Sequence, residues 1–218
     1  MRRFFRDNGL TITMLTLFLF SLVGQSVMGH KEYNEDQQAH RQPEISYSEY
    51  LTTGHFVEAT FENWESEFLQ MAMYVLLTAY LFQRGSSESK DPDKKEEVDR
   101  DPRRTRKDAP APVRRSGLVL KLYENSLFIA LMLLFLLSFT LHAAGGTNDY
   151  NREQMEHGEP TITFWQYLAG SRFWFESFQN WQSEFLSVAA IVVLSIWLRQ
   201  RGSPESKPVD APHDETGG

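Results

Sequence analysis

NWESEFLQMAMYVLL at residues 63–77 and NWQSEFLSVAAIVVL at residues 180–194 share the pattern Asn-Trp-x-Ser-Glu-Phe-Leu, and each copy leads into an apolar run. The two copies lie 117 positions apart, and the chain aligns with itself at that offset without a gap from Asn8 to Lys207. A gapless match of this length indicates a tandem duplication. We therefore divide the chain into a first repeat (1–90), a linker (91–116), a second repeat (117–207) and a tail (208–218).

Each repeat contains two apolar runs, which lie at 10–23, 68–82, 127–141 and 185–198. The first run of each repeat extends a few residues further, to 28 and 144. The second run approaches the roughly twenty residues of a membrane-spanning helix if its helix begins near Trp64 or Trp181. The apolar centres lack charged residues, as lipid-spanning helices do. The sequence therefore predicts an all-α fold, a four-helix transmembrane bundle made of two tandem parallel helical hairpins.

The first run could also be read as a cleaved signal peptide, because Arg2, Arg3 and Arg6 precede it. Its counterpart at 127–141 is internal, so we expect an uncleaved first helix.

The distribution of positive charge predicts the orientation. Eighteen of the 22 Lys and Arg residues lie before the first run, between the second and third runs, or after the fourth. The positive-inside rule then places both termini and the linker in the cytoplasm and the two other loops outside. These outer loops are acidic, with nine carboxylates at 32–67 and six at 149–184. Both repeats have the same orientation, so they form a parallel repeat.

The linker is rich in proline and charge and is expected to be disordered, as is the tail. The basic end of the linker adjoins the third apolar run, where it could contact anionic lipid headgroups. In the outer loops, Ser46 with Glu49 and Thr163 with Gln166 match the capping box. A helix rich in aromatic residues is therefore expected to begin at each, lying in the outer interface or capping the bundle.

The repeated motif supplies most of the candidate functional residues, which are Asn63, Trp64, Ser66, Glu67, Asn180, Trp181, Ser183 and Glu184. A structural interpretation explains each residue type: Trp anchors at the membrane boundary, Asn and Ser cap, and Glu suits a helix N-terminus. The functional interpretation is that Glu67 and Glu184 meet near the bundle axis. There they would bind a cation, gate a pore, or hold a basic side chain of a partner.

Other polar positions are candidates too. Gln25 and His142 occupy equivalent positions inside the first and third runs, where polar groups are commonly functional. A second repeated motif, Arg-Gly-Ser-x-Glu-Ser-Lys, follows the second and fourth runs. Its glycines, Gly85 and Gly202, are expected to end those helices in the left-handed conformation. Its remaining residues predict a cytoplasmic docking surface or a contact between the repeats; they are Arg84, Glu88, Lys90, Arg201, Glu205 and Lys207.

Asp36 with His40, and Glu153 with His157, place a carboxylate and an imidazole four residues apart, a spacing that could hold a metal on a helix. Prolines lie just beyond both pairs and no third ligand recurs. We therefore expect a solvated loop, and we assign no metal, cofactor or catalytic residue.

Several stretches resemble a family of bacterial integral membrane proteins known only as a domain of unknown function. They are Asn8–Leu10, Gly54–Phe56, Glu58–Ala59, Glu62–Met71, Gln83–Ser86 and Phe173–Phe185. The resemblance covers nearly the whole chain apart from the linker. It implies a bacterial cytoplasmic membrane and no particular activity.

Three hypotheses for function remain open. The first is a non-enzymatic interaction, scaffold or accessory protein of the bacterial envelope, because no nucleotide loop, nucleophile–base pair or convincing metal site is present. The second is a small oligomeric cation channel or carrier that uses Glu67 and Glu184. The third is a membrane enzyme with acid–base groups among Glu67, Glu184, His142 and the outer histidines. The expected partners are the lipid bilayer, a membrane or cytoplasmic protein and a second copy of the chain, but no nucleic acid.

Overall fold

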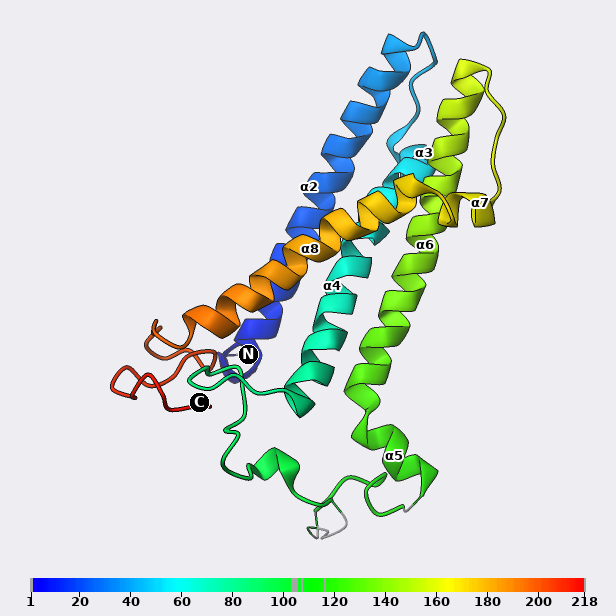
Figure 1. Cartoon of the computed structure of the whole chain (residues 1–218). Helices are drawn as coiled ribbons and strands as arrows, with labels where there is room; N and C mark the ends of the chain where they lie inside the picture. Colours follow the sequence, from blue (N-terminus) through cyan, green and yellow to red (C-terminus); the bar gives the residue numbers. More distant parts are fainter. Residues whose placement is uncertain (1, 103–105, 107, 116, 218) are drawn as a thin grey trace. The chain divides into compact units, whose positions relative to one another are not determined.

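The computed structural model describes residues 2–102, 106, 108–115 and 117–217, and every regular element in them is helical. Figure 1 shows their order along the chain. The elements are α1 (Arg2–Asp7), α2 (Gly9–Ala39), α3 (Tyr47–Tyr50), α4 (Gly54–Tyr80), the 3₁₀ helix η1 (Glu97–Asp99), α5 (Leu118–Glu124), α6 (Ser126–His157), α7 (Phe164–Leu168) and α8 (Ser171–Leu194). The all-helical prediction is confirmed. Among the described residues, α2 and α6 are the two helices long and apolar enough to cross a membrane.

The chain forms two compact units, and neither coincides with a sequence repeat. The first unit combines Met1–Thr60 with Leu141–Leu168, and the second combines Phe61–Thr140 with Ala169–Gly218. Each unit therefore contains parts of both repeats. The boundary between the units falls within α4 and within α6, so each of these helices contributes to both.

In the first unit, α2 and α6 continue well past their apolar runs and end at Ala39 and His157. The sequence interpretation of these segments as loop was wrong. In α6 the helix continues even through 145–151, whose residues are poor helix formers, where the start of α4 packs closely against it. Both helices end with the same hydrogen bond. The amide of Gln42 donates to the carbonyl of Gln37 (2.8 Å), and the amide of Glu159 donates to that of Gln154 (2.8 Å).

The residue before each of these amides is left-handed, as a Schellman motif requires. Arg41 has φ 59° and Gly158 has φ 71°. The equivalent ends of α2 and α6 are thus built alike, although only the second has the glycine that signals this motif in a sequence.

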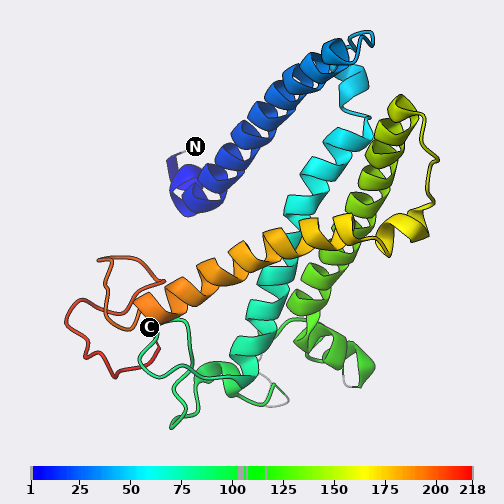
Figure 2. The same ribbon diagram turned by 45° about the horizontal axis from the view of Figure 1, so that its top comes forward.

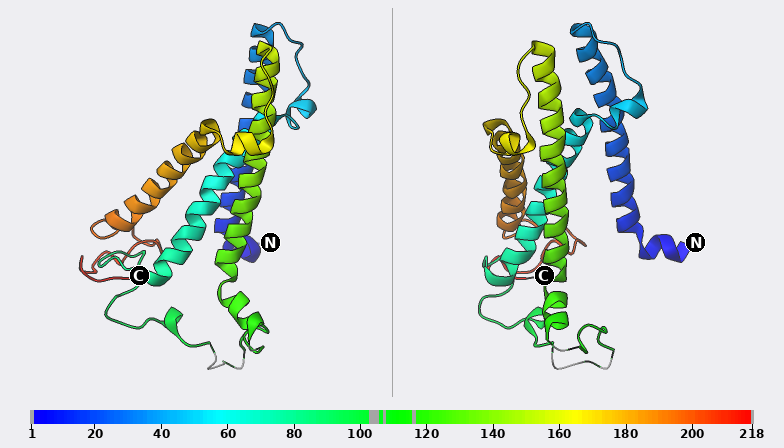
Figure 3. Two further views of the ribbon diagram at one scale, coloured as in Figure 1. Left: turned by 45° about the vertical axis from the view of Figure 1, so that its right-hand side comes forward. Right: turned by 90° about the vertical axis from the view of Figure 1, so that its right-hand side faces the viewer.

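After each long helix the chain turns back along it, as both panels of Figure 3 show. In each repeat the side chain of an asparagine on the long helix hydrogen-bonds to the backbone of the returning loop segment. Asn34 donates to the carbonyl of Ile45 (3.1 Å) and accepts from its amide (2.9 Å). Asn151 makes the same pair of bonds with Ile162, at 2.9 and 2.8 Å. Paired donor and acceptor groups let these loop segments pack against a helix without unsatisfied backbone.

Both predicted capping boxes are confirmed. The Ser46 side chain accepts from the Glu49 amide and the Glu49 carboxylate accepts from the Ser46 amide. Thr163 and Gln166 exchange the same bonds, at 3.3 and 2.8 Å. The helices that they start, α3 and α7, have only four and five residues. Half of the aromatic residues expected in outer interfacial helices lie in α3 and α7, and the other half belong to α4 and α8. These two long helices begin at Gly54 and Ser171 rather than near Trp64 and Trp181.

A tyrosine lies over a glycine in each copy. Tyr50 and Tyr167 are almost fully buried. A Cβ on Gly29 would lie 2.1 Å from the Tyr50 hydroxyl, and one on Gly146 would lie 2.3 Å from that of Tyr167. The start of α4 also approaches α6 closely, because a Cβ on Gly54 would lie 2.6 Å from the carbonyl oxygen of Gly145. Gly54 is therefore needed for close packing, a role that no sequence pattern around it indicates.

In the second unit, the segment after α4 lies beside the C-terminal tail (Figure 2). The Gly85 amide donates to the Thr216 hydroxyl (2.8 Å), and the Gly217 amide donates to the carbonyl of Ser86 (3.0 Å). Gly85 and Gly202 are left-handed as predicted, with φ 85° and 84°. They do not cap the helices, however, because α4 ends at Tyr80 and α8 at Leu194. The glycines lie in the turns that follow.

Candidate functional site

The two Asn-Trp-x-Ser-Glu-Phe-Leu motifs lie on α4 and α8, in the second unit, and hydrogen bonds join them. The side-chain amide of Asn180 donates to the Glu62 carboxylate. The Trp181 indole N–H donates to Oε1 of Glu65 at 2.9 Å. Glu65 is fully buried. Trp181 is thus a hydrogen-bond donor between helices, in addition to any role at a lipid boundary.

The serines of the motif have a local role in both copies. Ser66 donates to the carbonyl of Asn63, and Ser183 donates to that of Asn180, each at 2.8 Å. A serine hydroxyl that bonds the carbonyl three residues earlier satisfies itself within its own helix. This local bond gives a structural reason for the Asn-x-x-Ser spacing in each copy.

Glu67 is exposed and Glu184 is half-buried. The two lie near enough for their charges to repel each other. One buried side chain, Gln70, holds Glu184: its amide donates to the Glu184 carbonyl (2.9 Å), to Oε2 of the Glu184 carboxylate (3.1 Å) and to the Ser187 hydroxyl (3.0 Å). Gln70 and Ser187 are equivalent positions of the two repeats. The carboxylates of Glu67 and Glu184 therefore lie beside the hydrogen bond between Gln70 and Ser187, which joins equivalent positions of the two repeats.

Three aromatic rings lie close to the ring of Trp181. Its ring lies 5.5 Å from that of Phe178, 6.2 Å from that of Trp174 and 6.3 Å from that of Phe135, measured between centroids. In the other copy Trp64 lies 5.0 Å from Phe61 in an edge-to-face arrangement. Such pairs stabilise packing beyond the area they bury.

The polar candidates within the apolar runs differ from each other. Gln25 is exposed on α2, whereas His142 on α6 is fully buried. A ring nitrogen of His142 lies within 4.8 Å of a carboxylate oxygen of Glu58. Glu58 is itself buried and accepts a hydrogen bond from the Tyr167 hydroxyl at 2.9 Å. Comparison of the two repeats does not single out Glu58 as a candidate site residue, because the equivalent position of the second repeat is Phe175.

The Arg-Gly-Ser-x-Glu-Ser-Lys motif folds back on itself in both copies. The Gln83 amide donates to the Ser89 hydroxyl (2.8 Å), and the Gln200 amide donates to that of Ser206 (2.9 Å). The first serine of each motif likewise accepts from the amide of its glutamate, Glu88 or Glu205, at 3.1 Å. These turns account for the serines and the spacing without a docking partner.

The charged residues of the motif have separate partners. Arg84 pairs with Asp93 (2.7 Å), Lys90 pairs with Asp99 (2.6 Å) and Glu88 accepts from Tyr74. Arg201 is exposed. The two copies also touch, because Ser87 donates to the carbonyl of Glu205 at 3.1 Å and the hydroxyls of Ser86 and Ser195 lie 2.9 Å apart.

Lys207 is the most deeply buried of these charged groups. Its ammonium donates to the carbonyl oxygens of Pro212 (3.1 Å), His213 (3.0 Å) and Glu215 (2.8 Å). Burial lowers the pKa of Lys207 below its ordinary value, and the charge of Arg199 acts in the same direction. Lys207 therefore organises the tail around itself.

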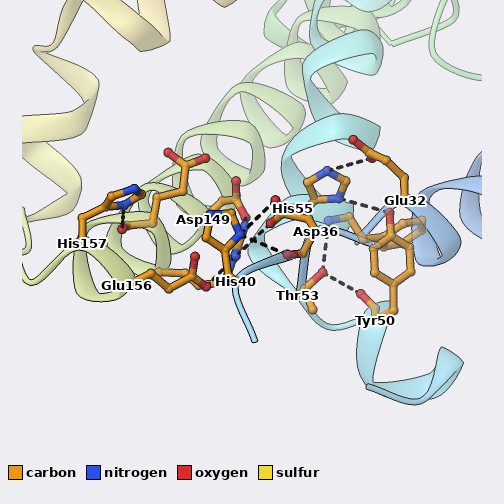
Figure 4. A network of polar contacts seen from close by, with 12 residues as sticks. Glu32, Asp36, His40, Tyr50, Thr53, His55, Asp149, Glu156 and His157 are labelled. Carbon is orange, nitrogen blue, oxygen red and sulfur yellow. Dashed lines mark hydrogen bonds and ion pairs between the residues drawn. The ribbon is translucent and has the colours of Figure 1, made fainter. Parts of the chain in front are cut away.

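The first unit contains a network of ionisable side chains at the ends of α2 and α6 and the start of α4 (Figure 4). Arg152 lies at its centre. The guanidinium contacts Glu156 at 2.7 Å, Asp149 at 3.4 Å and Asp36 at 3.6 Å, and it stacks on the Tyr33 ring at 4.9 Å. Burial opposes its charge, but these neighbours, Asp149 first, outweigh burial and raise the pKa of Arg152.

The other side of the network is formed by Tyr50, His55 and Glu32. The Tyr50 hydroxyl lies 3.2 Å from Nδ1 of His55, and Nε2 of His55 lies 3.6 Å from the Glu32 carboxylate. Burial, followed by the charge of Glu32, raises the pKa of Tyr50 to about 12. Tyr50 therefore stays neutral at physiological pH and acts as a structural hydrogen-bonding group.

The network also brings together the residues whose spacing suggested a metal. Carboxylate oxygens of Asp36 and Glu156 and a ring nitrogen of His40 all lie within 4.8 Å of one another. The His157 ring is 6.3 Å from that of His40, between centroids. The second unit holds the two motifs, and the first unit holds this network.

A family model described as a domain of unknown function, DUF6766, matches residues 1–218. No curated protein and no solved structure gives a match.

Proposed function

The chain belongs to DUF6766, a family described as a domain of unknown function, and we propose that it is an integral membrane protein that acts by interaction within the bacterial cell envelope. The apolar surface of α2 carries this proposal. In its most apolar stretch of 18 residues, only 6% are buried by the rest of the chain, against 22% in α6. Leu10 and Phe20 are 74% and 78% exposed. Exposed apolar surface of this extent requires lipid or a partner.

The proposal includes four membrane crossings. α4 and α8 have 27 and 24 residues, which at about 1.5 Å per residue is enough to cross a hydrocarbon core of about 30 Å. Their C-terminal halves carry exposed apolar side chains, among them Leu77, Leu186 and Val193. With the positive charge concentrated before α2, between α4 and α6 and after α8, the termini lie in the cytoplasm.

An interaction role agrees with how the recurring motifs are used. Most of their polar side chains take part in bonds within the chain, whereas the apolar surface of α2 is poorly covered and is available to a partner. We propose that a membrane helix of another protein, or a second copy of this chain, packs there. Association between such helices relies on packing contacts that lipid alone would not reproduce.

A photocrosslinking experiment in native membranes tests this role. A photoreactive amino acid replaces Phe20 on the exposed face of α2, Leu133 on α6 provides a matched exposed position, and buried Ala72 provides the background. We expect a discrete protein adduct at Phe20 that is absent at Ala72 and weaker at Leu133. Adducts with lipid alone at both exposed positions would contradict the interaction role and leave the membrane assignment in place.

A second function is favoured by one observation, the proximity of Glu67 and Glu184. In this alternative an oligomer passes cations, and the two carboxylates together with the acidic outer loops attract them. The Glu67→Gln, Glu184→Gln double variant in proteoliposomes tests it. Cation flux that disappears in the double variant would establish transport, and flux that is equal with and without the wild-type protein would exclude it.

A further inference from the structure

We propose that the ends of α2 and α6 form a binding site for a divalent transition-metal cation of the Zn²⁺ class, with Asp36, His40, Glu156 and His157 as its ligands. The four residues belong to one compact unit, and they come from the two equivalent helices of the repeats. Imidazole together with carboxylate is a ligand set that suits Zn²⁺ and its neighbours in the first transition series. The site is independent of the proposed partner surface on α2.

Geometry supplies what the sequence lacked. Asp36 and His40 lie one turn apart at the end of α2, and α6 adds Glu156 as a third ligand. The ligand atoms of these three residues already lie within 4.8 Å of one another. The Asp36 carboxylate lies 3.3 Å from Nδ1 of His40, so its side chain must rotate toward Nε2 for both residues to bind one ion at the roughly 2.0–2.2 Å that Zn²⁺ requires.

The histidines are prepared for ligation in the same way. Nδ1 of His40 lies 3.0 Å from the carbonyl oxygen of Asp36, and Nδ1 of His157 lies 2.7 Å from that of Glu153. A carbonyl oxygen only accepts hydrogen bonds, so Nδ1 carries the proton in both neutral rings. The lone pair is then on Nε2. A backbone carbonyl that fixes the tautomer in this way is a common support for metal-binding histidines.

The same bond at both equivalent positions is an observation separate from the clustering of charges. Each histidine is bonded to the carbonyl four residues earlier, and the two rings face each other at 6.3 Å in an edge-to-face arrangement. A shared ion would therefore join the two repeats at the ends of their long helices.

The guanidinium of Arg152 supplies the positive charge beside these carboxylates in the structure. It contacts the two carboxylates that the ion needs, Glu156 at 2.7 Å and Asp36 at 3.6 Å. A metal would take over these carboxylates, while Asp149 and the Tyr33 ring continue to hold the guanidinium. Loss of the positive charge at position 152 should therefore strengthen metal binding, which non-specific binding to surface histidines would not show.

The test uses full-length protein in detergent, purified without a histidine tag. Zn²⁺ binding is measured by calorimetry, and the coordination of Co²⁺ is read from its visible absorption. We expect one saturable site per chain. The His40→Ala, His157→Ala double variant should weaken binding by more than the roughly 10- to 100-fold that loss of a residue supporting a metal ligand costs. The His30→Ala, His213→Ala variant is the matched control and should bind like the wild type.

Arg152→Gln is the second arm, with Arg152→Lys as its charge-preserving control. Tighter binding in Arg152→Gln and unchanged binding in Arg152→Lys would support the site. Helicity and elution volume show whether each variant is folded, and Glu156→Gln replaces the double variant if that one is not. The absence of saturable binding, or equal affinity in wild type and ligand variants, would overturn the proposal.

Discussion

Gly29 lies under the hydroxyl of Tyr50, and the fit leaves no room for a methyl group. Gly29→Ala would place Cβ 2.1 Å from the Tyr50 oxygen, so the ring or the helix must move. We expect the free energy of unfolding in detergent to fall by about 1 to 3 kcal/mol, the usual range for overpacking a tight contact. Gly24→Ala is the matched control, because a Cβ there meets nothing within 4 Å.

The double variant with Tyr50→Phe identifies the cause. Without the hydroxyl, the atom nearest to the new Cβ is Cζ of the ring, at 3.1 Å. Gly29→Ala should therefore cost clearly less in a Tyr50→Phe background than in the wild type. Equal costs in both backgrounds would show that the glycine acts through helix flexibility instead.

Replacing Arg41 by glycine should stabilise the folded protein. It holds the left-handed conformation that Gly158 holds in the second repeat, and a side chain there is strained. We expect Arg41→Gly to raise the free energy of unfolding by about 0.5 to 1 kcal/mol, since relief of strain exceeds the added flexibility of the unfolded chain. Gly158→Arg should have the opposite sign. Thermal unfolding of both variants measures this, and a destabilised Arg41→Gly would contradict the account.

Some of this detail could be predicted from the sequence and some could not. Ser46 and Glu49 lie three residues apart, so their capping box is a local pattern that a sequence displays. The contact of Tyr50 with Gly29 joins residues on different elements, and no spacing rule reveals it. Arg41 was also beyond prediction, because a helix end of this type is recognised by glycine.

The two capping boxes should differ in how their stability responds to pH. In α3 the acceptor is the Glu49 carboxylate, and its hydrogen bonds with Ser46, the side chain first and then the backbone, lower its pKa below the ordinary 4.5. A lowered pKa in the folded state stabilises it above the ordinary value, and this contribution is lost as the pH falls through the lowered pKa. In α7 the acceptor is neutral Gln166.

Glu49→Gln should therefore remove part of the acid sensitivity of the protein. The difference in unfolding temperature between wild type and Glu49→Gln should be constant above pH 5 and should change in favour of the variant below about pH 4.5. Gln166→Glu should introduce the same dependence at α7. A difference that stays flat down to acid pH would show that the Glu49 carboxylate is not engaged in the folded protein.

The contact between α4 and α8 includes the hydrogen bond that the Trp181 indole donates to the buried Glu65 carboxylate. Trp181→Phe keeps an aromatic ring for Phe178 but leaves Glu65 without this donor. We expect a loss of about 1 to 2 kcal/mol in the free energy of unfolding, the upper range for a polar contact between membrane helices. Glu65→Gln is the control, since its amide oxygen still accepts from the indole. A larger loss in the control than in Trp181→Phe would contradict this assignment.

The sequence predicted that helices form in these regions better than it predicted their limits. The apolar runs marked four long helices, and all four are present. The starts of α4 and α8 were misplaced by about ten residues because polar and aromatic residues between Gly54 and Trp64 interrupt the apolar pattern without interrupting the helix. The role of Glu65 was missed for a related reason: Gln182 takes its place in the second repeat, and only recurring residues were weighed.

For the whole molecule, the duplication indicated which residues to examine but not which of them meet. The spacing of Asp36 and His40 predicted no metal site, because no third ligand recurs between the repeats. In the structure Glu156 of α6, at the position where the first repeat has Ala39, lies beside them. Convergence of this kind depends on how α2 and α6 pack. The sequence alone shows which side chain stands at each position, but it does not show which side chains lie close together in the folded protein.

We propose that the chain crosses the membrane four times, with the ends of α2 and α6 outside. The chain contains no cysteine, so single cysteines can be labelled without background. Exposed positions for them are Gln42, Lys95, Glu159 and Asp214. In intact cells an impermeant maleimide should label Gln42→Cys and Glu159→Cys, and it should reach Lys95→Cys and Asp214→Cys only after permeabilisation. Labelling of Lys95→Cys or Asp214→Cys in intact cells would show that α4 or α8 does not cross, and would contradict the account.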